Sequence, residues 1–328
     1  MTNKYMNRIS TIARRFMLLS LLFAASGVFA QTRPYYEQGQ GVSAVYEGWT
    51  ANDDGSFNLM FGYMNENWDE EIDVPVGANN SFSPGPADRG QPTHFLPRRN
   101  RYVFEFQVPA DFGEQELVWT LVTTDGVTQK AFGSLHRDYF LDDITIMSET
   151  GATGSGRDTS PELRANIKPM VTLKGSANRT VAVGESLELA VKVMDDGLPP
   201  VKVLSPGQLA RRPAWDPENM TPREMLKLAL EPPLRGTVAK VVGLHFTWFV
   251  YRGDGEVSFD SPQVAPWEDT RAFQNSPWSP FWIVPEAPED GAWTTEATFH
   301  EAGTYVLHGR ADDGGLYADV EVTISVEP

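Results

Sequence analysis

The sequence predicts an all-β protein, with two antiparallel β-sandwich domains joined by a linker of Gly, Ser and Thr. Apolar and polar residues alternate over short segments such as 57–63, and this two-residue period is typical of strands with one buried face. Asp54-Gly55 and Asp125-Gly126 lie between such segments and are typical hairpin-turn dipeptides. Residues 148–163 are rich in Gly, Ser and Thr and carry no apolar pattern, which favours a linker.

Residues 1–30 are typical of a secretory signal peptide. Basic residues precede a short apolar stretch, and Ala30 ends a run of small residues, so we expect cleavage near Ala30 and a periplasmic or extracellular mature chain. No later run reaches the roughly 20 apolar residues of a membrane helix. The chain has no cysteine, so its stability must come from buried apolar surface.

The charge of the chain excludes one class of partner. The formal net charge is −17, and it becomes −21 when the four basic residues of the leader are removed. Nucleic-acid binding depends on basic residues that neutralise phosphates, so we expect no nucleic-acid partner.

Residues 31–147 predict the first sandwich, with seven or eight strands. Two of the alternating segments lie at 102–108 and 117–121, and no segment shows a helical period. The residues expected on the buried face of the first two long strands are Phe57, Leu59, Phe61, Tyr63, Tyr102, Phe104, Phe106 and Val108.

Residues 164–328 fit an immunoglobulin-like order of strands, A to G. Trp248 would lie buried on strand C, and Tyr305 would open strand F, as in sandwiches of this class. Two insertions, 197–243 and 260–292, interrupt the order after strands B and D. The first contains a short helix that we expect from Pro222 to Leu230, with Thr221 and Glu224 as a capping box.

The end of the chain resembles a known family. Glu301-Ala302-Gly303-Thr304-Tyr305-Val306-Leu307, Ala311-Asp312-Asp313-Gly314-Gly315 and the alternating valines that follow are similar to the end of a polycystic-kidney-disease (PKD) or related immunoglobulin-like domain. The resemblance implies a β-sandwich that serves as a spacer or binding module. The first domain, through Tyr46-Glu47-Gly48-Trp49 and 90–99, resembles a segment of uncharacterised exported bacterial proteins, which implies no activity.

The insertions are rich in aromatic residues, which require burial or a ligand. They could form a mini-core that joins the two insertions, or a partly exposed surface that binds a sugar or peptide. The candidate ligand-binding residues here are Trp215, Trp267, Trp278, Phe281 and Trp282.

Two pairs of carboxylates close strands B and F at the same end of the second sandwich. Asp195, Asp196, Asp312 and Asp313 could converge there as ligands of a calcium ion, which takes six to eight oxygens. Asp-Asp-Gly is equally good turn chemistry, so both interpretations stay open.

Arg98 and Arg99 belong to a basic cluster in the first domain, with Arg89, Arg101 and His94 close in sequence. These arginines could pair with the acidic body of the protein or bind an anion or carboxylate. His245 and His308 could approach each other on the outward face of strands C and F, although a solvated or interdomain face explains them better.

The leading hypothesis is an exported, non-catalytic protein that binds a glycan, a cell-surface component or another exported protein. The alternatives are a polysaccharide hydrolase that uses two carboxylates and a purely structural spacer. A cleft with two carboxylates would favour the hydrolase, and a flat row of exposed rings would favour binding.

Overall fold

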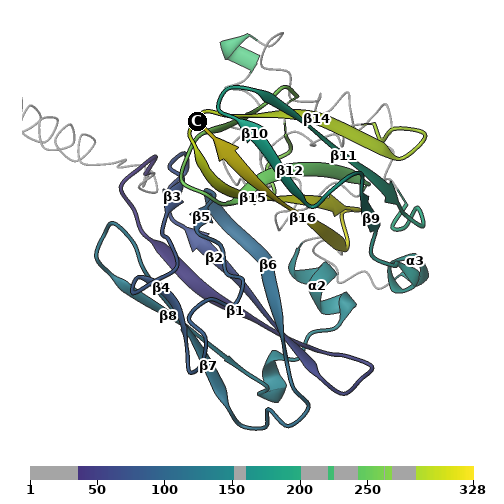
Figure 1. Cartoon of the computed structure of the whole chain (residues 1–328). Coiled ribbons are helices and arrows are strands. Elements are labelled where there is room, and N and C mark those ends of the chain that lie inside the picture. Colours follow the sequence, from purple (N-terminus) through teal and green to yellow (C-terminus); the bar gives the residue numbers. More distant parts are fainter. Residues whose placement is uncertain (1–35, 151–159, 201–220, 225–242, 262, 268–285) are drawn as a thin grey trace, which may run out of the picture. The chain divides into compact units, whose positions relative to one another are not determined.

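The computed structural model describes most of the two sandwiches (Figure 1). The described residues are 36–150, 160–200, 221–224, 243–261, 263–267 and 286–328. The predicted signal peptide, the centre of the predicted linker and most of both insertions lie outside them. Residues 38–328 form one compact unit.

Eight strands build the first sandwich, as predicted. They form three sheets, with orders β1-β2-β6, β4-β7-β8 and β3-β5, and the paired strands run antiparallel. The bounds are β1 (Val42–Ala51), β2 (Phe57–Asn65), β3 (Ile72–Asp73), β4 (Asn80–Ser83), β5 (His94–Phe95), β6 (Arg98–Val108), β7 (Glu116–Val122) and β8 (Thr128–Ser134).

The first core is built from aromatic side chains. Trp119 is fully buried, stacks against Phe82 and lies edge-on to Phe104. Its indole Nε1 donates to Asn80 Oδ1 at 2.9 Å, so the polar atom of this buried ring is satisfied. Leu59, Phe61 and Phe104 join this core, as the alternation predicts.

The prediction for Tyr102 is wrong, and an irregularity in strand β6 explains why. The β2–β6 register shifts between Phe61 and Tyr63, and Tyr102 has a positive φ of 50°. A bulge of this kind changes the face to which the following side chains point. Val103 therefore enters the first core, while Tyr102 packs in a separate cluster with Met147 and Leu316.

The second sandwich has the predicted immunoglobulin-like strand order. Its two sheets run β13-β14-β11-β9 and β10-β16-β15-β12, which correspond to D-E-B-A and to C-F-G with one added strand. The bounds are β9 (Met170–Leu173), β10 (Asn178–Ala182), β11 (Ser186–Met194), β12 (His245–Arg252), β13 (Val257–Phe259), β14 (Ala292–Phe299), β15 (Gly303–Asp312) and β16 (Tyr317–Glu327).

Two features confirm this assignment at the level of side chains. Trp248 on β12 is 2% exposed and belongs to the second core. The hydroxyl of Tyr305 donates to the carbonyl of Glu301 at 3.0 Å, which is the corner expected at the start of strand F. Strand β10 was not predicted, and it pairs with β16 in parallel.

The helices differ from the prediction of a single short one. A 3₁₀ turn, η1 (Arg137–Tyr139), and two helices, α2 (Asp143–Glu149) and α3 (Pro161–Ala165), lie in or next to the predicted linker. Asp142 and Ser160 cap these two helices through Thr145 N and Leu163 N. In the predicted helix of the first insertion, residues 222–224 are helical, and Thr221 and Glu224 form the expected reciprocal capping bonds.

Strand β12 joins the two sandwiches. One edge of β12 pairs with β15 of the second sandwich. The carbonyl of Tyr251, at the end of β12, accepts a hydrogen bond from Thr93 N of the first sandwich at 3.2 Å. Phe249 and Tyr251 point outward and belong to the first core, and Arg252 donates to both carboxylate oxygens of Asp88 at 3.0 and 2.7 Å. The outward face of this sheet is therefore an interdomain face.

Candidate functional site

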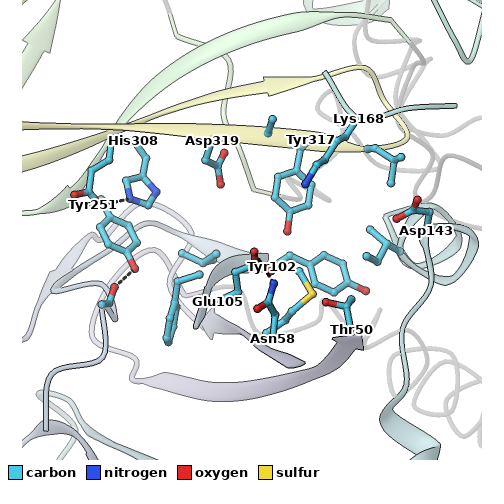
Figure 2. A pocket seen from close by; sticks show the side chains of 18 of the residues that line it. Thr50, Asn58, Tyr102, Glu105, Asp143, Lys168, Tyr251, His308, Tyr317 and Asp319 are labelled. Atoms are coloured by element: carbon cyan, nitrogen blue, oxygen red, sulfur yellow. Dashed lines mark hydrogen bonds and ion pairs between the residues drawn. The ribbon is translucent and has the colours of Figure 1, made fainter. Parts of the chain in front are cut away.

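A cleft of about 600 Å³ lies between β2 and β6 of the first sandwich and β15 and β16 of the second. Side chains from both domains face each other across it (Figure 2). Helix α2 contributes Asp143, and Lys168, which follows α3, closes the same side. The site is thus assembled from strands that are more than 200 residues apart in the sequence.

On the second sandwich, an ion pair between the buried Arg310 and the partly exposed Asp319 supports the wall of the cleft. Arg310 donates through Nε and Nη2 to the two oxygens of Asp319 at 2.8 and 2.7 Å. The same Nη2 donates to the carbonyl of Tyr102 at 3.0 Å, and the guanidinium lies 4.2 Å from the ring centroid of Tyr317. These contacts hold the side chains of Asp319 and Tyr317 in position.

A stacked pair of rings forms one end of the cleft. Tyr251 and His308 are nearly parallel, with ring centroids 3.7 Å apart, and the Tyr251 hydroxyl donates to the Gly90 carbonyl. His308 Nε2 lies 3.2 Å from Glu321 Oε2, and this hydrogen bond lowers the pKa of Glu321. Nδ1 of His308 is buried and has no hydrogen-bond partner in the described structure.

The first sandwich supplies Tyr102, Asn58 and Glu105. The bulge in β6 turns Tyr102 towards the second sandwich, where its buried ring lies 6.4 Å from that of Tyr317, at an interplanar angle of 21°. Glu105 remains accessible to solvent and accepts from Asn58 Nδ2 at 3.3 Å. Burial by the surrounding protein and the charge of Asp319 raise the pKa of Glu105, and Lys168 opposes them.

This arrangement suits the binding of a polar ligand. The partly exposed ring of Tyr317 offers a flat apolar face, while carboxylates and an amide offer hydrogen bonds in fixed directions. A cleft of several hundred Å³ with a few convergent polar groups is the usual form of a small-ligand site.

The four predicted calcium ligands mainly serve turns in the described structure. Asp195 Oδ2 and Asp312 Oδ1 accept from Gly197 N and Gly314 N at 2.9 and 2.7 Å. Asp196 accepts from Ile167 N and Leu198 N, and Asp313 Oδ1 accepts from two backbone amides of the β15–β16 turn. Across the described ranges, no group of three or more His, Asp or Glu side chains is placed to hold a metal ion. Calcium binding stays a prediction.

Burial perturbs two of these carboxyl groups. It raises the pKa of Asp195, and it raises that of Asp313 to about 7 against the opposing backbone hydrogen bonds. Oδ1 of Asp195 and Oδ2 of Asp313 are buried and lack partners in the described part of the chain.

Of the predicted aromatic ligand-binding residues, only Trp267 lies within the described ranges. It is partly buried and packs against the core of the first sandwich. The described residues therefore do not place it in a mini-core shared by the two insertions. Its indole nitrogen is buried without a hydrogen-bond partner in the described structure. Trp215, Trp278, Phe281 and Trp282 lie outside the described residues.

The candidate anion-binding arginines contact the body of the first sandwich. Arg99 Nη2 forms a 2.6 Å ion pair with the buried Glu47, and burial nevertheless raises the pKa of Glu47. Arg98 lies over the ring of Trp68 at 4.0 Å and donates to the Glu66 carbonyl at 2.6 Å. These contacts fit the pairing alternative, and anion binding stays untested.

His245 and His308 are not brought together. In the β12–β15 ladder, His245 lies opposite Asp312, and His308 lies opposite Phe249. The interdomain interpretation of this face is the one that the contacts support.

His94 lies between two carboxylates beside the β12 contact. Its Nδ1 is 2.7 Å from Asp73 and its Nε2 is 2.8 Å from Glu71. Burial disfavours the charged ring, but the hydrogen bonds and charges of these carboxylates outweigh it and raise the pKa to about 9.

Protein stability is therefore expected to fall as the pH rises through 9. The pKa of His94 is higher in the folded protein, at about 9, than in the unfolded chain, at about 6.5. The protonated ring therefore stabilises the folded state fully below pH 6.5, and this stabilisation is lost as the pH rises through the folded pKa. We expect His94→Gln to remove about 2 kcal/mol of stability at pH 6 and less at pH 9.5. Urea unfolding at both pH values measures this. The exposed His136, replaced by Gln, serves as the control, and an equal loss at both pH values for His94→Gln would contradict the assignment.

Sequence reasoning missed most of the cleft. Glu105, Asp319 and Glu321 occupy the polar positions of alternating strands, which are usually solvated. The available signal was the group of aromatic and basic residues on the outward face of strands C and F, because such a face requires a covering partner.

Comparison with known proteins adds no identification. No protein-family model and no curated protein matches the chain. Among solved structures, domains 4 and 5 of the S-layer protein SbsC are 8% identical, with 88% of this chain and 98% of that chain covered and a TM-score of 0.21. The adhesin InvE of Yersinia pseudotuberculosis is 9% identical, with 86% and 58% covered and a TM-score of 0.22.

The fibronectin(III)-like modules of Clostridium thermocellum CbhA are 9% identical, with 88% and 94% covered and a TM-score of 0.21. Scores this low carry no argument about function. No helix within the described ranges is long and apolar enough to cross a membrane. The strand pairing itself establishes the class: the chain is an all-β protein of antiparallel sandwiches, the second of them immunoglobulin-like.

Proposed function

We propose that this chain is an exported, non-catalytic binding protein that holds a glycan in the cleft between its two sandwiches. The observation that carries the proposal is the cleft itself, which both domains line with tyrosine rings and hydrogen-bonding groups. The leader-like residues 1–30 support export.

A glycan fits the chemistry of the walls. Sugar rings present apolar C–H faces that pack on aromatic rings, and their hydroxyls both donate and accept hydrogen bonds. Tyr317 supplies a partly exposed ring, and Glu105 and Asn58 supply acceptors and a donor. A polyanionic glycan is disfavoured because Glu105, Asp319 and Glu321 are acidic and the whole chain is acidic.

The contacts between the two sandwiches favour ligand binding without a large movement of one sandwich relative to the other. Arg252 donates to the carboxylate of Asp88, the Tyr251 hydroxyl donates to the Gly90 carbonyl, and Arg310 donates to the Tyr102 carbonyl. These independent contacts hold the two walls of the cleft in place. Walls held in the binding geometry reduce the entropy lost on association.

Titration calorimetry with soluble hexasaccharides tests the proposal. The probes are cellohexaose and the hexamers of glucosamine and N-acetylglucosamine, and at least one is expected to bind. Asn58→Trp, which places a large ring in the cleft, should reduce the affinity of that probe at least tenfold. Asn178→Trp is the matched control, because Asn178 is exposed on β10 and does not line the cleft. Absence of binding by every probe, or equal loss in both variants, would contradict the proposal.

A hydrolase is the second candidate, because the cleft holds two carboxyl groups in different environments. Glu105 has a raised pKa, as a general acid requires, and Asp319 pairs with Arg310 at 2.7 Å. Both oxygens of Asp319 already accept from Arg310, which suits a charge stabiliser better than a free nucleophile. Release of new reducing ends from the bound hexamer, lost in Glu105→Gln, would favour the hydrolase over the binding protein.

A further inference from the structure

We infer that the glycan carries protonated amines, and that Glu105, which lines the cleft together with Asp319, receives one of them. This inference rests on the proposed function and names the class of its ligand. It depends on which of the charges in the cleft already have partners.

Two of the cleft carboxylates are satisfied by bases of the protein. Asp319 receives two hydrogen bonds from Arg310, at 2.8 and 2.7 Å. Glu321 lies 3.2 Å from Nε2 of His308, and that contact holds its pKa low. Neither group needs a cation from a ligand.

Glu105 is placed differently. Its hydrogen bond, 3.3 Å long, comes from the neutral amide of Asn58. Lys168 lies near enough to lower its pKa, yet burial and Asp319 prevail and the pKa is raised. Because the hydrogen bond that Glu105 accepts is long and comes from a neutral amide, a cation that reaches this carboxylate would add a charge-assisted contact.

The neighbouring ring of Tyr317 also suits a cation. It is partly exposed in the cleft, and a cation is attracted to the face of such a ring. The protein already uses this interaction, because the guanidinium of Arg310 lies 4.2 Å from the Tyr317 centroid. An amine on a sugar could be held by Glu105 while the sugar ring packs on tyrosine.

The test compares the hexamer of glucosamine with that of N-acetylglucosamine, in which acetylation removes the positive charge. Titration calorimetry at mildly acidic pH, where the amines are protonated, is carried out on the full chain and on two variants. Glu105→Gln removes the carboxylate from the cleft. Glu116→Gln makes the same change on an exposed residue of β7 outside the cleft, and it controls for the net charge of the protein.

The unaltered protein is expected to bind the glucosamine hexamer about tenfold more tightly than the acetylated one, the effect of one charge-assisted hydrogen bond. Glu105→Gln should abolish that preference, and Glu116→Gln should retain it. Thermal melts establish that both variants are folded.

The unfavourable outcomes separate the two proposals. Equal binding of both hexamers by the unaltered protein would overturn the inference about charge and leave glycan binding in place. An equal loss of affinity in both variants would overturn the role of Glu105. Failure of cellohexaose and of both hexamers to bind would overturn the proposed function, and this inference with it.

Discussion

Trp248→Ala is expected to lower the free energy of unfolding by about 3 to 5 kcal/mol, the usual cost of truncating a buried aromatic residue. Trp248 is 2% exposed and lies in the second core beside Phe246, with ring centroids 5.4 Å apart. Alanine leaves a cavity that the surrounding strands cannot fill by relaxing. Urea unfolding followed by circular dichroism measures the change.

Trp248→Phe is the matched variant, because it keeps an aromatic ring at this position and should lose markedly less. A Trp248→Ala protein as stable as the parent would contradict the place of β12 in the second sandwich, and with it the immunoglobulin-like strand order.

Arg310→Ala is expected to lower the free energy of unfolding by about 2 kcal/mol. It removes a buried guanidinium together with its two hydrogen bonds to Asp319, whose side chain is partly exposed. It also removes the hydrogen bond to the Tyr102 carbonyl, which links the second sandwich to the first. Urea unfolding again measures the loss.

A double-mutant cycle makes this prediction specific. Adding Asp319→Ala removes the carboxylate that lost its partner in Arg310→Ala, so the double variant should be more stable than Arg310→Ala alone. If the two single losses simply add, then the ion pair contributes nothing to stability and the account of this wall is wrong.

The sequence predicted the sheets well, because alternation records which face of each strand is buried. Leu189, Val191 and Val193 on β11 and Val322, Ile324 and Val326 on β16 all lie in the second core, as the two-residue period requires. Strand β10 was missed because its residues, Asn178 to Ala182, are largely polar and exposed, and only pairing with β16 makes them a strand.

The candidate site could not be predicted in the same way. Tyr102 follows the alternation of β6 but leaves the first core, because the bulge and its positive φ depend on tertiary contacts. Glu105 and Asp319 stand at polar positions that a single sheet would leave in water. Only the packing of β12 on the first sandwich turns those two polar faces into a cleft.

The sequence indicated the long loops as the site, not the sheet faces. Long insertions are often functional, and aromatic residues such as Trp215 and Trp282 favoured a site there. That surface stays a prediction, since these residues lie outside the described part. The carboxylates at the strand ends illustrate the limit of such reasoning, because Asp312 and Asp313 accept hydrogen bonds from their own turn.

Hydrogen–deuterium exchange with and without the tightest-binding hexasaccharide tests most directly whether the cleft between the sandwiches is the binding site. Ligand binding is expected to slow exchange in β6 around residues 102–106 and in β16 around residues 317–321, which lie on opposite walls of the cleft. Slower exchange confined to other segments, such as 263–267, with both walls unchanged, would contradict the account.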